Sequence, residues 1–240
     1  MIIDKIIRDK VTVLLEQASY NIILPFYKNL REDEIETKTT SDDFVTTADR
    51  QVEIFLTNAL IKLIKHSSVI GEEASLIDSD YSSILKNEFV WTIDPIDGTK
   101  NYIGGNEAFC SMIALLHFGK VIASWIFIPT SAICYFADKY GVQVRYPDSL
   151  YHPVETRKSH IKHIRVYDLS FSASLKYLNS ELKEKVKKKL NVIEKRVFIG
   201  SVGIEATLLA NAKIDFIFYS ATSPWDHAPV DIFNRACGGK

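Results

Sequence analysis

The chain has 240 residues, of which 47% are hydrophobic and 25% charged, a composition typical of a globular protein. Its 29 basic and 30 acidic side chains give a net charge of −1, which argues against a nucleic-acid-binding surface. The longest apolar run, residues 121–128, is far shorter than the ~20 residues that span a bilayer. Charges interrupt the N-terminal residues, unlike a signal peptide, and three widely spaced cysteines form no CxxC pair. We therefore expect a cytoplasmic protein without membrane or nucleic-acid partners.

Helices and strands are expected to alternate along the first hundred residues. Residues 2–20 and 52–63 carry apolar side chains at helical spacing, and the polar residues 37–47 between them predict a loop. Residues 69–71 and 89–93 are rich in β-branched and aromatic side chains, which predicts two buried strands. The first of these strands would end at Glu72 and the second at Asp94.

The segment from residue 108 to residue 144 has a different pattern. Turn-forming residues at 119–120, 129–131 and 139–141 interrupt its apolar runs, and the simplest interpretation is an antiparallel meander of three strands. Residues 145–165 give no clear element. A helix over 181–190 with Leu182, Val186 and Leu190 inward, a helix from Ser201 to about residue 212 and a strand over 214–219 complete the prediction. The meander argues against a purely parallel, doubly wound sheet, so we expect a layered α/β fold with mixed sheets.

Two aspartates, Asp94 and Asp97, follow a hydrophobic strand and are separated by a proline that stiffens the chain. Ligands of α/β proteins bind at the ends of strands. Gly98 permits close backbone approach, and Thr99 can begin a helix whose free N–H groups hold a phosphate. Carboxylates beside such a site would repel a phosphate unless cations lay between them. Mg²⁺ fits this role because it prefers oxygen ligands and shares them with phosphate.

Further acids occur at Glu72, Glu73 and Asp226, but the residues alone do not show whether these positions meet in space. Each has a simpler interpretation. Asp-Pro and Asp-Gly are common turn formers, and a Glu-Glu pair is usually a solvated turn. Asp226, which follows a proline, can cap the N-terminus of a helix.

Taken together, these segments resemble the inositol monophosphatase family. Its motifs G-E-E, W-x-I-D-P-[LIVM]-D-G-T-x-N-[FY], W-D-x-A and V-T-x-A-D appear here at residues 71–73, 91–102, 225–228 and 45–49. The resemblance spans residues 1–240, weakly over 145–195. It implies a single domain in the form of an α-β-α-β-α sandwich, built from two packed halves at about 1–145 and 146–240. Family members continue beyond this point, so we expect the C-terminal strands to be missing.

The resemblance implies hydrolysis of a small soluble phosphate monoester with two or three Mg²⁺ ions. One ion would be surrounded by Glu72, Asp94, the Ile96 carbonyl and the Thr99 hydroxyl. A second would be held by Asp94, Asp97 and Asp226, and a weaker third by Glu72 through water, with Glu73 behind these ligands.

The resemblance also assigns the remaining catalytic and binding roles. Thr99, with Asp49 behind it, would orient and deprotonate the attacking water. The phosphate and the leaving alcohol would be bound by Asp97, Gly98, Thr99, Gly200, Ser201 and Asp226. Ser201 has an alternative role as the cap of the following helix.

Several polar residues are expected to play no direct part. Lys38 lies in a polar segment near the expected entrance and should be solvated. His227 should be a neighbour of the acids, because imidazole suits softer metals than Mg²⁺. His160 and His163, among basic residues, are expected on the surface.

The substrate stays open between several phosphate esters. Relatives that act on inositol phosphate place a Glu seven residues before the W-D aspartate, and here that position is Tyr219, which can donate or stack. Related sugar or polyol phosphates, histidinol phosphate and bisphosphate nucleotides are alternatives. A catalytically weak homologue with a binding or regulatory role is the competing hypothesis, motivated by Tyr219 and the short C-terminus. Lithium sensitivity and a homodimer are further implications of the resemblance.

Overall fold

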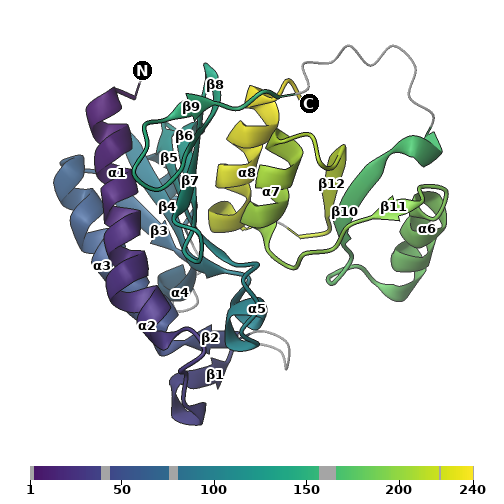
Figure 1. The fold of residues 1–240 in the computed structure, drawn as a ribbon, viewed down its shortest axis with the longest axis horizontal. Coiled ribbons are helices and arrows are strands. Elements are labelled where there is room, and N and C mark those ends of the chain that lie inside the picture. The colour runs from purple at the N-terminus through teal and green to yellow at the C-terminus, as the bar shows by residue number, and fades with distance from the viewer. Residues whose placement is uncertain (1–2, 39–43, 76–80, 157–165, 222, 240) are drawn as a thin grey trace.

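The protein is a stack of alternating helical and sheet layers (Figure 1). The structure is a computed structural model, and it describes residues 3–38, 44–75, 81–156, 166–221 and 223–239. The predicted α-β-α-β-α order is confirmed. Helices on the outer side of a large sheet form the first layer, two helices separate that sheet from a small one, and a single helix covers the far side.

The first layer consists of α1 (Lys5–Ala18) and α3 (Thr47–Leu63). A π-helical turn, Ser19–Ile23, leads from α1 into the short α2 (Leu24–Phe26). Asp4 caps α1 by accepting a 2.7 Å hydrogen bond from the N–H of Ile7. The apolar face of each helix is buried against the large sheet, as the helical spacing predicts.

The large sheet has seven strands in the order β3-β4-β5-β6-β7-β8-β9. Only β3 and β4 run parallel, and each later strand is antiparallel to the one before it. The bounds are β3 Ser68–Gly71, β4 Phe89–Asp97, β5 Cys110–His117, β6 Lys120–Ile128, β7 Ile133–Asp138, β8 Gly141–Arg145 and β9 His152–Pro153. The prediction of a three-stranded meander was wrong by one strand, because three turns join four strands.

Strand β4 continues past its predicted end. It was expected to end at Asp94, but it runs to Asp97, and its register with β5 shifts between these two aspartates. Asp94 pairs with Met112 and Asp97 with Cys110, so the intervening residues bulge out of the ladder. The bulge aims two acidic side chains from one strand at the same place, and α5 (Thr99–Ile103) begins directly after it.

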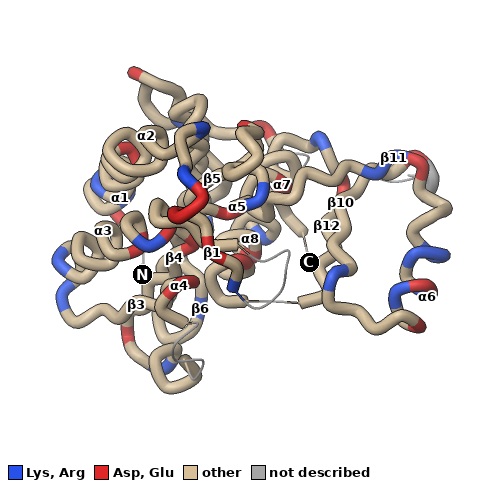
Figure 2. Tube along the Cα trace, turned by 90° about the horizontal axis from the view of Figure 1, so that it is seen from below, with Lys and Arg blue, Asp and Glu red and all other residues tan. Residues whose placement is uncertain are grey.

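The middle layer consists of α7 (Val202–Ala210) and α8 (Pro224–Ala236), which pack on the large sheet. On their other side lies a parallel sheet in the order β11-β10-β12, with bounds β10 Ser170–Ser174, β11 Lys195–Arg196 and β12 Phe216–Tyr219. Helix α6 (Ser180–Leu190) covers this small sheet. Figure 2 shows Lys positions following one another along α6, while acidic positions gather around α4 (Glu72–Ser75) and α8.

Two local expectations need correction. The predicted loop at residues 37–47 contains parts of a hairpin, in which β1 (Ile35–Thr37) pairs with β2 (Phe44–Thr46); residues 39–43 lie outside the described chain. Leu182 faces solvent and is 46% exposed, because only Val186 and Leu190 of α6 reach the small sheet. His160 and His163 lie outside the described residues. Among the helices that are described, none has the length and apolar character to cross a bilayer.

Candidate metal centre

Three carboxylates from distant parts of the chain meet at the bulge of β4. One oxygen from each of Asp94, Asp97 and Asp226 lies within 4.8 Å of the other two. Asp226 stands in the first turn of α8, and α8 packs across β4 and β5. The alternative in which Asp226 caps this helix is wrong, because the cap position is Ser223, whose hydroxyl donates to Asp226 Oδ2.

Asp94 has the most restrictive surroundings of the three. Its side chain is buried, and its Oδ1 atom has no hydrogen-bond partner in the described part of the chain. Burial raises its pKa well above the ordinary value, and the negative charges of Glu72, Asp97 and Asp226 raise it further. A buried acceptor without a donor, surrounded by like charges, is the setting that a divalent cation with a preference for oxygen ligands would stabilise.

Asp97 is held by the start of α7. It accepts hydrogen bonds from Ser201 Oγ at 2.5 Å, from the N–H of Gly203 at 2.7 Å and from the N–H of Val202 at 3.0 Å. Burial raises its pKa to about 6, although the Ser201 bond opposes this shift. Ser201 also caps α7 by accepting from the N–H of Ile204 at 3.3 Å. The capping alternative for Ser201 is therefore correct, and the same hydroxyl orients a carboxylate of the acidic cluster.

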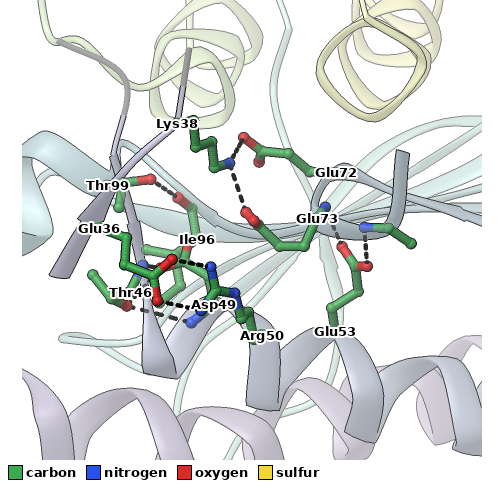
Figure 3. Close-up of polar contacts among 11 residues, drawn as sticks. Glu36, Lys38, Thr46, Asp49, Arg50, Glu53, Glu72, Glu73, Ile96 and Thr99 are labelled. Carbon is green, nitrogen blue, oxygen red and sulfur yellow. Dashed lines mark hydrogen bonds and ion pairs between the residues drawn. The ribbon is translucent and has the colours of Figure 1, made fainter. Parts of the chain in front are cut away.

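Glu72 and Glu73 share one buried cation (Figure 3). Lys38 Nζ lies 2.7 Å from Oε1 of each, and only 3% of the lysine side chain is exposed. The expectation of a solvated Lys38 was wrong, because two acids hold its ammonium group inside the protein. Burial raises the pKa of Glu72 to about 8, although Lys38 lowers it. Glu53 of α3 fixes the backbone here by accepting from the N–H groups of Glu73 and Ala74 at 2.8 and 2.9 Å.

Thr99 is the first residue of α5, and Asp49 lies in the first turn of α3 (Figure 3). The Thr99 hydroxyl donates to the Ile96 carbonyl at 3.0 Å. Asp49 Oδ2 accepts from the hydroxyl and the N–H of Thr46, at 2.5 and 2.8 Å. Its Oδ1 is buried and has no partner among the described residues, and burial raises the Asp49 pKa to about 7. One carboxylate oxygen is thus fixed by the hairpin while the other stays available.

Gly98 makes the turn between the acids and α5 possible. It has a φ of +88°, which an L side chain rarely adopts. A Cβ at this position would also lie 3.0 Å from the Ala108 carbonyl oxygen and 3.1 Å from Ser201 Cβ. The sequence-based expectation that this position needs close backbone approach is supported by both observations.

A cavity of about 280 Å³ opens beside the acids. At one end it is lined by Glu72, Asp97 and Asp226, and at the other by residues of the small sheet and its loops. These include Gly200 and Ser201, together with Ser174, Lys176, Tyr177, Phe198, Val202, Glu205, Tyr219, Ser220, Ala221 and His227. Three of the predicted metal ligands, Glu72, Asp97 and Asp226, therefore line the same cavity as Gly200 and Ser201, which were predicted to bind the alcohol.

Comparison with known proteins identifies the family. The profile of the inositol monophosphatase family matches residues 8–240. The chain belongs to this family. An inositol monophosphatase of Dictyostelium discoideum is 27% identical over 239 residues, which is 99% of this chain and 84% of the relative. The Nus factor SuhB of Vibrio cholerae is 24% identical over 207 residues, covering 84% of this chain and 72% of that protein.

The fold of this inositol monophosphatase-family member is also that of solved relatives. A crystal structure of an IMPase/NADP phosphatase complexed with Mg²⁺ and phosphate superimposes with a TM-score of 0.75. The two are 19% identical, and the match covers 97% of this chain and 81% of the other. At this identity the likeness concerns the fold alone.

One important residue of this family member was missed from the sequence. Glu205, inside α7, is buried and accepts from the N–H groups of Ile199 and Gly200 at 3.2 and 3.4 Å through Oε1. Its Oε2 accepts a 2.7 Å bond from the Tyr219 hydroxyl. The available signal was an acid in an otherwise apolar helix, which needs buried partners. The Tyr219 hydroxyl thus donates to a buried acid, and the residue also lines the cavity.

His227 is a neighbour of the acids, as expected. Its Nδ1 lies 3.2 Å from the Ser223 carbonyl oxygen, and its ring stands edge-on to Tyr219 with the centroids 5.5 Å apart. Its side chain therefore supports the wall of the cavity beside Asp226.

Proposed function

We propose that this protein hydrolyses a small soluble phosphate monoester in a Mg²⁺-dependent reaction. The observation that carries the proposal is the convergence of Asp94, Asp97 and Asp226 within 4.8 Å of one another, around a buried oxygen without a donor. Asp94 and Asp97 are buried and Asp226 is half-buried, and such a cluster of like charges is costly unless protons or cations neutralise it. Family membership and the adjoining cavity support a cation that is shared with a phosphate.

The residues present fit two Mg²⁺ positions and a weaker third. Asp94, Asp97 and Asp226 would hold one of the two main ions, and Glu72 would hold the weaker third ion. The remaining position would use Glu72, Asp94, the Ile96 carbonyl and the Thr99 hydroxyl. When bound, the ions neutralise phosphoryl oxygens, lower the pKa of coordinated water and stabilise the leaving alkoxide.

Side chains of the protein orient the attacking water and accept its proton. The Thr99 hydroxyl, at the start of α5, orients the attacking water. Asp49, through its free Oδ1, acts behind Thr99 in deprotonating the water. Its pKa of about 7 suits a group that takes up a proton near neutrality. Water attacks the phosphorus directly as the P–O bond to the alcohol breaks. The alkoxide leaves as the alcohol after taking up a proton, and the phosphoryl group passes to water without a phosphoenzyme.

Binding of the ester is divided between two sides of the cavity. The N–H groups of Gly98 and Thr99 hold the phosphate at the beginning of α5. The leaving alcohol faces Asp97, Gly200, Ser201 and Asp226, which line the cavity or adjoin it. An inositol phosphate or a related sugar or polyol phosphate is the substrate class suggested by the named relatives.

The test is phosphate release from a panel of monoesters, with and without Mg²⁺, by the wild type and by Asp94→Asn. We expect Mg²⁺-dependent release that falls at least a thousandfold in the variant, because the shared ligand is removed while the shape is kept. Asp231→Asn is the matched control, since this acid lies on the surface of α8 paired with Arg235 at 2.7 Å. Undiminished activity in Asp94→Asn would refute the proposal.

A second candidate is a binding or regulatory role with weak catalysis. It is favoured by the similarity to a relative named as a Nus factor. Lack of phosphate release across the whole panel, from folded protein with Mg²⁺ present, would select this candidate over the first.

A further inference from the structure

The small sheet ends in an edge strand, β12, that is open to further pairing. In the described part of the chain, β12 pairs with β10 along one side and with no strand along the other. Edge strands of native proteins are commonly very short, charged or interrupted by proline, which discourages further pairing. The opposite edge strand, β11, has only two residues, Lys195 and Arg196, and β9, at one edge of the large sheet, contains Pro153. β12 lacks such protection, because its four residues, Phe216–Tyr219, are all apolar or aromatic.

The N–H groups of two β12 residues point to this open side. The N–H of Asp215, just before the strand, donates to the Ser170 carbonyl of β10 at 2.7 Å. Successive N–H groups of a strand point to opposite sides, so those of Phe216 and Phe218 point away from β10. An extended chain beside β12 would accept both of these hydrogen bonds, which is how peptides add to the edge of a sheet.

A second cavity, of about 540 Å³, adjoins β12 and is lined by residues of β12, α7 and α8. Ile217, Leu209 and Val230, one from each of these elements, give it an aliphatic wall. Ile217 lies on the same face of the strand as Tyr219, whose hydroxyl donates to Glu205 of α7. An added strand would direct every second side chain to this face, so apolar side chains at those positions would enter the cavity.

The charges around this second cavity disfavour an acidic occupant. Asp215 and Asp231 line it, and within the described chain its lining includes no lysine or arginine. Arg235, which pairs with Asp231 at 2.7 Å, offsets one of these two carboxylates. The remaining negative charge favours a neutral or basic segment over an acidic one.

The second cavity shares a wall with the one beside the acids. Tyr219 and His227 line both, and their rings stand edge-on with the centroids 5.5 Å apart. Glu72, Asp97 and Asp226 line only the cavity of the metal centre. A chain docked at β12 would therefore contact the shared wall without touching these three acids.

We propose that an extended segment of another protein, apolar at alternate positions and neutral or basic between them, docks as a fourth strand beside β12. Its backbone would accept from the N–H groups of Phe216 and Phe218, and its apolar side chains would fill the second cavity at Ile217 and Val230. The inference goes beyond the proposed function, and binding tests it without any phosphatase activity.

The probe is a blocked peptide of about seven residues that alternates valine and lysine, long enough to span the four residues of β12. Fluorescence anisotropy of the labelled peptide with the full chain should show saturable binding. Hydrogen exchange should become about tenfold slower at the N–H groups of Phe216 and Phe218. The N–H of Asp215, which already has a partner in β10, is the internal control and should change little. A peptide with glutamate in place of lysine should bind more weakly.

Methylated peptides distinguish strand addition from non-specific apolar adhesion. All valine N–H groups lie along one edge of the extended peptide, and all lysine N–H groups lie along the other. Methylation of the nitrogens on the edge that faces β12 should weaken binding about tenfold, whereas methylation of the other edge should leave it nearly unchanged. Equal effects of the two methylated peptides, a lack of saturable binding, or unprotected N–H groups at Phe216 and Phe218 would overturn the proposal.

A substitution in the cavity tests the same site from the side of the protein. Val230→Arg should weaken peptide binding about tenfold, because a long cationic side chain then occupies the cavity and repels the lysines. Val13→Arg is the matched control, since Val13 is 44% exposed on α1, in the first helical layer, and this variant should bind as the wild type does. Sedimentation tests the other occupant. A wild type that dimerises, together with a monomeric Val230→Arg, would assign the edge to a second copy of this chain and overturn the proposal.

Discussion

Lys38 Nζ lies 2.7 Å from Oε1 of Glu72, an acid for which the family resemblance predicts metal binding. The same ammonium group contacts Glu73 at 2.7 Å and is almost completely buried. A lysine in this position neutralises Glu72 in the absence of a divalent ion. Since Lys38 already neutralises charge at Oε1 of Glu72, we expect it to compete with a metal ion bound at this carboxylate.

Removal of this lysine should expose the competition. In Lys38→Met, two buried acids lose their cation, so the Tm without Mg²⁺ should fall on the order of 5 °C. Mg²⁺ should then raise the Tm by more than it does in the wild type. Thermal unfolding with and without Mg²⁺ measures both effects. Lys185→Met, which breaks an exposed pair with Glu181, is the matched control and should change little. An equal Mg²⁺ response in Lys38→Met and the wild type would contradict the competition.

The clustered acids predict the pH dependence of the metal-free protein. In the folded state the pKa is about 6 for Asp97, about 7 for Asp49 and about 8 for Glu72, all above the ordinary carboxyl range. The folded chain therefore holds protons that the unfolded chain has released, and its free energy of unfolding falls as the pH rises from about 5 to about 8. Tm without metal should be lower at pH 8 than at pH 5.5.

Mg²⁺ should reverse much of this loss, because it replaces the protons that neutralise the acids. The Tm increase on adding Mg²⁺ should consequently be larger at pH 8 than at pH 5.5. Asp94→Asn, with one negative charge fewer in the cluster, should show a smaller Tm decline with pH. A wild-type Tm that rises steadily over this range without metal would be inconsistent with these pKa values.

Much of the site could be predicted because its chemistry is local in the sequence. Asp94, Pro95 and Asp97 lie at the end of one strand. The glycine at position 98 indicates a positive φ, and the structure has one there. Only the family resemblance could predict that Asp226 lies beside these aspartates, since its position depends on how α8 packs on the sheet. Composition and spacing say nothing about such long-range packing.

The errors share a physical cause. Lys38 and Glu205 are charged residues, for which solvation is the default expectation, yet each is buried by partners that are distant in sequence. Strand β4 was ended too early because an Asp-Pro pair usually interrupts a ladder. Here the bulge places the proline outside the hydrogen-bonded register, and pairing resumes at Asp97 with Cys110.

Lithium should inhibit the phosphatase activity at millimolar concentrations. The third proposed cation position, which Glu72 would hold without the aspartates, is the weakest, because Lys38 competes for the same carboxylate. A small monovalent ion can replace a loosely held Mg²⁺ there without supplying its charge. Initial rates at fixed Mg²⁺, with LiCl compared against equal concentrations of KCl, measure the effect. A rate that responds identically to both salts would count against a weak Mg²⁺ position.

The Tyr219–Glu205 bond should set the rigidity of the turn that faces the leaving group. Tyr219→Phe keeps the ring but leaves a buried Glu205 oxygen without its donor, which should cost about 1–3 kcal/mol of unfolding free energy. Because Glu205 also holds the N–H groups of Ile199 and Gly200, KM should rise several-fold while kcat changes less. Urea unfolding and steady-state kinetics test the two parts, with Tyr140→Phe as a control in which no buried partner is lost. If kcat fell and KM stayed constant, Tyr219 would instead act on the reacting atoms, since an interaction made only in the transition state affects kcat alone.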